Sequence, residues 1–264
     1  MKKVIGLAVF GEKNSYAQYL ATSIRAYLTL FPNFEVWIHH DEHFDSFGYA
    51  KTLKILSRKE IVRLVPMATR PTQGKCENML WRLFPAWTFD VSYIFSRDLD
   101  ALPTWKERSA VEEFISSDFE THTIIDNPAH AGIMGGLCGF KAHKLRNMFS
   151  TFEKFISYAK FSDERWAQHG ADQDYLNGKL APYLHILEHT IKGRSTIPIS
   201  EHRPINGFID DRVSLFIADK SMEFVPYLGV AGYDRAPAID FYNRWCPKNS
   251  DITSAEKQSG EHDC

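Results

Sequence analysis

The sequence contains no long uninterrupted apolar run. Its first apolar segment, residues 4–10, ends where charge returns at Glu12 and Lys13. A membrane-spanning helix needs about 18 or more consecutive apolar residues, and a signal peptide needs a small-residue cleavage site after its apolar core. We therefore expect a soluble, cytoplasmic protein without a transmembrane segment or signal peptide, in which residues 4–10 form the first buried strand.

Cysteine is scarce, and neither sign of charge is in clear excess. The four cysteines are scattered, and no Cys-x-x-Cys pair has the spacing of a zinc site. Free thiols in a reducing compartment are therefore the expected state. The formal net charge is -2, whereas a nucleic-acid-binding domain carries a concentrated basic patch. We expect no nucleic-acid partner.

A glycine-rich phosphate-binding loop is also missing after the first strand. Residues 10–13 (Phe-Gly-Glu-Lys) contain a single glycine, so the dinucleotide fingerprint G-x-G-x-x-G of dehydrogenases is absent there. A nucleotidyltransferase that activates a sugar phosphate typically opens with a glycine-rich loop and a basic residue at this place. That class is therefore kept only as an alternative.

Strand and helix patterns alternate through the first 100 residues. The apolar run 4–10 is followed by an amphipathic stripe that ends at Phe31, and then by a strand pattern at 35–40. A strand, a helix and a strand within 40 residues form a βαβ unit with parallel strands and a right-handed crossover. This alternation disfavours a non-catalytic sugar-binding module, which would more often be all-β. The other elements predicted in this half are strands at 61–65 and 91–96 and a helix at 76–84.

The second half of the chain is less regular. A capping box at residues 104–107 (Thr-Trp-Lys-Glu) predicts a helix that runs to about Ser117. From Pro247 onward the composition is polar and charged, with almost nothing to bury, which is typical of a disordered tail. The other predictions are a strand near 123–126 and helices at 145–160 and from Asp172. We expect one domain over 1–246, with a nucleotide-binding part (1–100) and an acceptor and catalytic part (101–246), followed by a disordered tail at 247–264.

The sharpest local feature is an Asp-x-Asp motif directly after a predicted buried strand. In open α/β sheets ligands bind beyond the carboxyl ends of the strands, and alternation along an extended chain points Asp98 and Asp100 to the same side. Two converging carboxylates repel each other unless a cation lies beside them. Because Mg²⁺ and Mn²⁺ prefer oxygen ligands, we predict that Asp98 and Asp100 bind Mn²⁺ or Mg²⁺.

Three stretches resemble, in chain order, the motifs of GT-A-type glycosyltransferases. They are residues 81–85 (Trp-Arg-Leu-Phe-Pro), residues 93–100 with the Asp-x-Asp motif, and residues 172–177 (Asp-Gln-Asp-Tyr-Leu-Asn). The last is similar to the Asp-Gln-Asp-x-Leu-Asn segment of retaining family 8 enzymes. Residues 133–139 resemble the small-residue strand on the acceptor side of these enzymes. The resemblance covers residues 1 to about 180 and extends to polysaccharide glycosyltransferases of bacteria and large algal viruses.

The resemblance implies a fold and an activity. The fold would be α/β and GT-A-like, with a mostly parallel central sheet flanked by helices and an irregular C-terminal acceptor-side portion. The activity would be metal-dependent transfer of a hexosyl or deoxyhexosyl group from a nucleotide diphosphate sugar, with a UDP-sugar favoured, to a hydroxyl of a glycan acceptor. Retention of configuration is favoured because no residue stands out as the base that an inverting enzyme requires. A viral protein of this kind would work in the host-cell cytoplasm.

The resemblance also implies roles near the reacting centre. Asp172 and Gln173 would line the reacting face near the anomeric carbon. Gly135 and Gly136 would let the donor sugar lie against the backbone, since a side chain would fill that space. A helix N-cap for Asp172 and a tight strand crossing without ligand for residues 132–139 are the alternative interpretations.

A third metal ligand is implied as well. In family 8 enzymes it is a histidine late in the chain, followed by a Gly/Lys/Pro/Trp-rich stretch that is missing here. His189 and His202 are the candidates, and His202 is preferred. The missing stretch leaves the stereochemistry open.

The remaining implied roles concern the donor. Phe10 and Gly11 would begin the loop that receives the nucleotide base. Arg82 and Lys75 would approach the sugar or diphosphate, where a guanidinium can pair with two anionic oxygens, and Arg97 would also contact the nucleotide. A surface ion pair is the alternative interpretation for Arg82.

Overall fold

A computed structural model describes the greater part of the first 204 residues. The described residues are 1–11, 20–47, 61–68, 75–99, 103–125, 130–190, 196–197 and 200–204. The predicted acceptor-side residues beyond 204 and the predicted tail at 247–264 lie outside these ranges. No helix within the ranges is both long enough and apolar enough to cross a membrane.

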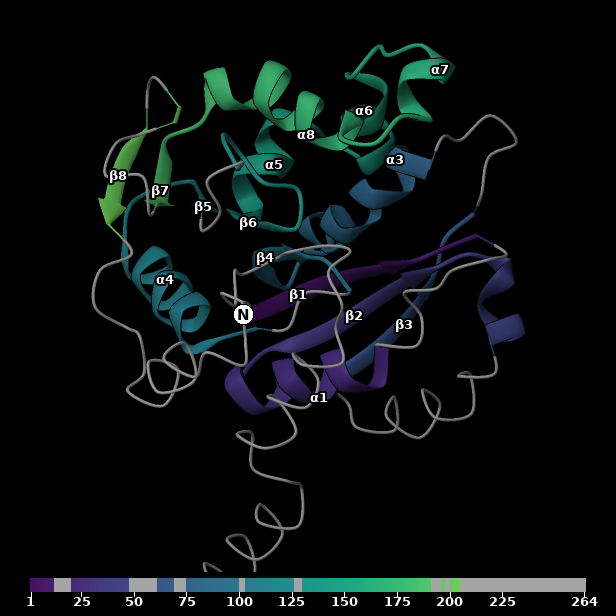
Figure 1. Cartoon of the computed structure of the whole chain (residues 1–264), viewed down its shortest axis with the longest axis horizontal. Coiled ribbons are helices and arrows are strands. Elements are labelled where there is room, and N and C mark those ends of the chain that lie inside the picture. The colour runs from purple at the N-terminus through teal and green to yellow at the C-terminus, as the bar shows by residue number, and fades with distance from the viewer. Residues whose placement is uncertain are drawn as a thin grey trace, which may run out of the picture. The chain divides into compact units, whose positions relative to one another are not determined.

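A sheet of eight strands forms the centre of the described part (Figure 1), in the order β3-β2-β1-β4-β6-β5-β7-β8. Every neighbouring pair is parallel except the two pairs that include β6. This confirms the predicted α/β class with a mostly parallel sheet. The strands are β1 (Lys2–Val9), β2 (Glu35–His40), β3 (Val62–Pro66), β4 (Val91–Arg97), β5 (Thr121–Ile125), β6 (Leu137–Lys141), β7 (Ile186–Thr190) and β8 (Glu201–Pro204).

Helices cover both faces of the sheet. Figure 1 shows α1 and α4 on one side, and α3, α5, α6 and α8 on the other. The α-helices are α1 (Leu20–Leu30), α3 (Lys75–Met79), α4 (Trp105–Ser116), α5 (Ala142–Met148), α6 (Phe152–Ser157), α7 (Asp163–Trp166) and α8 (Ala171–Tyr175). Short helices of other types are the 3₁₀ segments η2 (Glu42–Phe47), η3 (Leu80–Trp87) and η5 (Ala181–Tyr183), and the π-helical segment η4 (Leu176–Leu180).

The first strand is buried on both faces, as the apolar run predicted. Val4 packs into the core under η3, α5 and α6, whereas Ile5 and Leu7 pack into the core under α1 and α4. Alternate residues of a strand point to opposite faces, so a strand covered on both sides must be apolar throughout. Burial on both sides therefore explains why this strand lacks polar alternation.

Segment η3 lies directly on β1 at Gly6. A Cβ atom at Gly6 would lie 2.0 Å from the backbone oxygen of Arg82. Only glycine permits this approach of two backbones. The contact fixes η3, and with it the position of Arg82, over the middle of the sheet.

The helix predicted at 76–84 is divided into α3 and η3. Pro85 lies just beyond the predicted end and inside η3, and a proline disrupts an α-helix because it lacks an N–H and its ring clashes with the preceding turn. The buried residues Leu80, Leu83 and Ala86 follow one another at intervals of three, which matches the 3₁₀ period. The predicted helix at 145–160 is likewise divided, because Thr151 caps the start of α6 by accepting a hydrogen bond from the backbone N–H of Lys154.

The capping box at the start of α4 is confirmed in part. The side chain of Thr104 accepts a hydrogen bond from the backbone N–H of Glu107, as the motif predicted. The Glu107 carboxylate accepts a hydrogen bond from Arg97 Nε. This hydrogen bond links α4 to the end of β4.

His39 ties β2 to β1 from inside the core. It is fully buried, and its Nδ1 lies 3.0 Å from the backbone oxygen of Leu7, so Nδ1 carries the proton that is donated. Its Nε2 has no hydrogen-bond partner among the described atoms. Burial lowers the pKa of His39 to about 4 from the ordinary 6.5, because a charged ring there would be desolvated.

We expect Gly6→Ala to lower the free energy of unfolding by about 1–3 kcal/mol, because the added methyl group overpacks the β1–η3 contact. Urea denaturation of the purified protein measures this. Gly178→Ala is the matched control, because a Cβ at Gly178 meets nothing within 4 Å, and it should leave stability unchanged or raise it slightly. Equal effects of the two substitutions would contradict the close η3 packing.

We expect His39 to make stability fall as the pH falls. The unfolded chain takes up a proton near pH 6.5, whereas the folded chain does so only near pH 4, so the unfolded state binds more protons between these values. Full stability is present above pH 6.5 and up to about 3 kcal/mol is lost on approaching pH 4. His39→Asn keeps a donor for Leu7 and should flatten this part of the curve of unfolding free energy against pH. An unchanged slope would contradict the assignment.

Candidate active site

One guanidinium joins two carboxylates at the carboxyl end of β4. Asp98 directly follows β4, and its side chain is 23% exposed. Arg82 of η3 donates from Nη1 to Asp98 Oδ1 and from Nη2 to Asp172 Oδ2 of α8, at 3.2 Å. Its Nε donates to the backbone oxygen of Met79 at 2.8 Å. The three donor nitrogens of Arg82 are therefore all engaged.

Two members of this cluster, Arg82 and Asp172, are almost completely buried. The side chains of Arg82 and Asp172 are 2% and 8% exposed. Burial alone would lower the pKa of Arg82, but Asp98 and Asp172 outweigh it and raise that pKa. The pKa of Asp172 is raised by burial and by Asp98, against the lowering effect of Arg82. The neighbouring charges thus keep Arg82 cationic, while Asp172 is a carboxyl group whose charge is costly.

The positions of Arg82 and Asp172 bear on the alternative interpretations of these two residues, a surface ion pair and a helix N-cap. Arg82 is buried, so it does not form a surface ion pair. Asp172 lies in the first turn of α8, but the N-cap residue is Gly170 and makes no side-chain capping bond. The Asp172 carboxylate accepts a hydrogen bond from Arg82 Nη2 as well as from backbone N–H groups at the start of α8.

The loop at residues 132–136 forms the wall against which both carboxylates lie. A Cβ atom at Gly136 would be 1.9 Å from Asp98 Oδ2, and one at Gly135 would be 2.4 Å from Asp172 Oδ2. The two glycines therefore make room for the carboxylates themselves. This is a different use of the missing side chains from the predicted one, in which the donor sugar lies against them.

Phe10 and Gly11 lie at the carboxyl end of β1, which is adjacent to β4 in the sheet. The ring of Phe10 meets Trp81 of η3 edge to face, with centroids 5.8 Å apart. Gly11 has φ of +87°, and its backbone N–H donates to Asp41 Oδ2 at 2.7 Å. Asp41 Oδ1 also accepts from the backbone N–H of His43 at 3.0 Å. The start of the predicted base-binding loop is thus fixed by a buried aspartate.

Asp41 was not predicted as part of the site, although the sequence contained a usable signal. It directly follows β2, and the carboxyl ends of neighbouring parallel strands lie along one edge of a sheet. Its position is therefore equivalent to that of Asp98 after β4. A search for acidic residues after every predicted strand would have found it.

Arg97 requires a correction. Its side chain is fully buried, with Nε donating to Glu107 Oε1 and Nη1 donating to the backbone oxygens of Ser96 and Cys138 at 2.8 and 2.7 Å. Burial lowers the pKa of Arg97, and Glu107 more than compensates. Strand alternation turns Arg97 toward α4, away from Asp98. Arg97 is therefore a structural ion-pair partner, and we do not count it among donor-binding residues.

The predicted metal site falls only partly within the described residues. Asp100 and the side chains of Lys75 and His202 lie outside them. His189, the alternative ligand, is buried with Nε2 3.2 Å from Glu113 Oε2 of α4. Burial lowers the pKa of His189, and it lies on the α4 side of the sheet. The described ranges contain no group of three or more His, Cys, Asp and Glu placed to hold a metal ion.

Asp98 nevertheless has the properties of a ligand for a hard cation. Its Oδ1 accepts a hydrogen bond from Arg82, and its Oδ2 lies over the backbone of Gly136. A partly exposed carboxylate at the carboxyl edge of the sheet suits Mg²⁺ or Mn²⁺, which take oxygen ligands and keep positions for water and phosphate.

Gln173 lies half-buried next to Asp172, and its backbone oxygen accepts from Asn177 Nδ2 at 2.8 Å.

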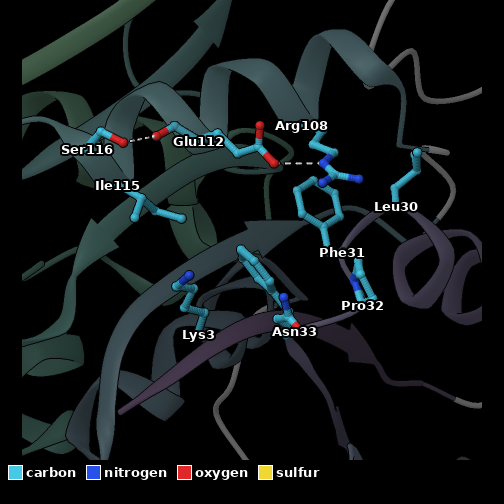
Figure 2. A pocket seen from close by; sticks show the side chains of 10 residues that line it. Lys3, Leu30, Phe31, Pro32, Asn33, Arg108, Glu112, Ile115 and Ser116 are labelled. Atoms are coloured by element: carbon cyan, nitrogen blue, oxygen red, sulfur yellow. Dashed lines mark hydrogen bonds and ion pairs between the residues drawn. The ribbon is translucent and has the colours of Figure 1, made fainter.

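A separate cavity of about 360 Å³ lies between the end of α1 and helix α4 (Figure 2). Its lining includes Lys3, Phe31, Arg108 and Glu112. Arg108 Nε donates to Glu112 Oε1 at 2.7 Å, so the single carboxylate in the lining is already paired. The cavity lies near the amino end of β1, whereas open α/β sheets bind ligands at the carboxyl ends. We therefore place the candidate active site at Asp98.

No protein-family model and no curated protein matches this sequence. Residues 1–349 of TarS from S. aureus match at 12% identity and a TM-score of 0.43, over 66% of this chain and 53% of that one. The chain thus spans about half the length of that structure. Mannosyltransferase PcManGT from Pyrobaculum calidifontis, in complex with GDP-Man and Mn²⁺, matches at 16% identity and a TM-score of 0.45, over 76% and 56%. A putative glucose-1-phosphate thymidylyltransferase from Bacillus anthracis matches at 9% identity and a TM-score of 0.46, over 85% and 98%. These similarities are similarities of the backbone alone, and they assign no role to any residue.

Proposed function

We propose that this chain transfers a hexosyl or deoxyhexosyl group from a nucleotide diphosphate sugar, with a UDP-sugar favoured, to a hydroxyl of a glycan acceptor. The observation that carries the proposal is the cluster of Asp98, Arg82 and Asp172 at the carboxyl end of β4, beside the loop that follows β1. This edge is where an open α/β sheet binds its ligand. The cluster brings together three separate sequence motifs, each of which resembles a part of a GT-A-type enzyme.

Each residue of the cluster has a distinct task in the proposal. Asp98 and Asp100 hold Mn²⁺ or Mg²⁺, with His202 as a candidate third ligand. A bound divalent ion would neutralise the charge that develops on the diphosphate leaving group. Arg82 orients the Asp98 carboxylate through a charge-assisted hydrogen bond, which fixes its direction more strongly than a neutral bond would.

On the other side of Arg82, Asp172 and Gln173 are the proposed catalytic residues. Arg82 Nη2 binds Oδ2 of the Asp172 carboxylate, and the backbone of Gly135 lies against the same oxygen. A carboxylate held in this way is preorganised against positive charge developing at the anomeric carbon. Phe10 and Gly11 begin the proposed loop for the base, and the latter is fixed by Asp41.

The first test is a thermal-shift screen with UDP, GDP, CMP and dTDP, each with Mn²⁺ and with EDTA. A ligand that binds only the folded state raises its melting temperature. We expect one nucleoside diphosphate, with UDP favoured, to raise Tm in Mn²⁺ and to lose this effect in EDTA. Product analysis with the matching nucleotide sugars then follows, with NMR of the anomeric configuration to test the favoured retention.

One outcome of the screen, and one outcome of a parallel assay with nucleoside triphosphates and sugar 1-phosphates, would contradict the proposal. Absence of a shift with every nucleotide would remove the donor site. A shift with a nucleoside triphosphate and a sugar 1-phosphate, together with release of pyrophosphate, would indicate the nucleotidyltransferase alternative instead.

We expect Asp98→Ala to abolish the Mn²⁺-dependent nucleotide shift and to lower kcat/KM for transfer by about 100-fold or more, because metal stabilisation of the leaving group is worth several kcal/mol. The fold should remain intact, since Arg82 keeps Asp172 and the backbone oxygen of Met79 as partners. Asp118→Ala removes an exposed carboxylate of the same size and serves as the control. Transfer at the wild-type rate by Asp98→Ala would contradict the proposal that Asp98 binds the metal ion.

A further inference from the structure

The loop at residues 132–136 is held by side chains rather than by a strand partner. Gly132 donates its backbone N–H to Thr196 Oγ1 at 2.9 Å. Thr123 Oγ1 donates to the backbone oxygen of Gly132 at 3.2 Å and accepts from the N–H of Met134 at 2.9 Å. Buried backbone groups must be paired, so the side chains that pair them determine where this loop lies.

The most complete of these contacts comes from Asn177. Its Oδ1 accepts from the backbone N–H of Ile133 at 2.6 Å, and its Nδ2 donates to the backbone oxygen of the same residue at 3.1 Å. Nδ2 also donates to the backbone oxygen of Gln173 at 2.8 Å. Both polar groups of one loop residue are thus bound by a single amide. Only an amide supplies an acceptor and two donors in this arrangement.

The close approach of Asn177 depends on Gly132. A Cβ atom at Gly132 would lie 2.2 Å from Asn177 Oδ1. Gly132 also has φ of +74°, a conformation that favours glycine. The sequence therefore provides both the amide and the open backbone position that it needs.

Asn177 and Asp172 reach the same loop from one helical segment. In a continuous α-helix residues five apart point about 140° away from each other. Here α8 gives way to the π-helical segment η4 at Leu176, between the two residues. A π-helical turn is wider than an α-helical turn and is often found at functional sites. Both side chains nevertheless reach residues 132–136 here.

We propose that Asn177 is a positioning residue, which fixes the loop at residues 132–136 so that Gly135 holds the Asp172 carboxylate in its reactive position. The proposal rests on the proposed glycosyl transfer. Asp172 Oδ2 lies directly on the Gly135 backbone, so any displacement of the loop moves the wall behind the carboxylate. A misplacement of about 1 Å can cost 100-fold in rate.

Two variants test this. Asn177→Ala removes all three hydrogen bonds. Asn177→Asp keeps the size of the side chain and the acceptor for the Ile133 N–H, but it places a carboxylate oxygen against the backbone oxygens of Ile133 and Gln173. Asn147→Ala is the control, because Asn147 is exposed on α5. We expect both Asn177 variants to lower kcat for UDP release from a panel of UDP-sugars by up to about 100-fold. The Tm shift by UDP with Mn²⁺ should fall much less than kcat, because Arg82 still binds Asp98 when the loop moves.

A second measurement separates positioning from general destabilisation. Hydrogen exchange of the peptide spanning 131–137 should accelerate in Asn177→Ala, while β1 keeps its protection. The kcat loss should persist well below the melting temperature of each variant. Recovery of wild-type kcat on cooling, or a parallel loss of kcat and UDP binding, would overturn the proposal.

The exchange measurement also separates failure of this inference from failure of the proposed function. A wild-type protein that binds none of the screened nucleotides with Mn²⁺ and releases none of them from the matching nucleotide sugars would refute the glycosyl transfer. Unchanged exchange of residues 131–137 in Asn177→Ala would refute the positioning role, whatever the activity.

Discussion

The candidate site depends on one buried cation, the guanidinium of Arg82. A charge without partners inside a protein is costly, and it persists only when it is paired and fully hydrogen-bonded. Arg82 meets this condition with two carboxylates and one backbone oxygen. The planar, forked guanidinium can serve three acceptors in different directions, which an ammonium group does less well. Its position in turn requires η3 to lie on β1, and this contact is possible because Gly6 has no side chain.

The sheet separates two ionic clusters that begin at adjacent residues, the last residue of β4 and the one that follows it. Arg97 points toward α4 and pairs with Glu107, next to the stacked rings of His122 and Phe114. Asp98 follows it and lies on the other side, with Arg82. The first cluster holds α4 against the end of β4, and the second faces the carboxyl edge where we propose that the donor binds. Because side chains alternate along an extended chain, Arg97 serves stability, whereas Asp98 belongs to the candidate site.

The fold was largely predictable because its signals are local. Each strand that the apolar runs predicted in the first 100 residues is present, and Thr104 caps α4 as the motif indicated. The errors came from competing local interactions. The last part of the helix predicted at 76–84 belongs to η3, which continues through Pro85, and Thr151 starts a new helix inside another predicted one. The antiparallel strand β6 was the main topological feature that the sequence did not reveal, because strand direction depends on partners far along the chain.

The sequence by itself determined that the sheet is mostly parallel and that Asp98 stands at its carboxyl edge, since both follow from periodicity and chain order. Only the tertiary structure decided the partners of the charged residues. Arg97, next to the motif, pairs with Glu107, whereas Arg82, distant in sequence, holds Asp98 and Asp172 together. The physical reason is that periodicity fixes the face on which a side chain lies, but the helix covering that face is chosen by long-range packing. The same packing brings Asn177 to the loop at residues 132–136.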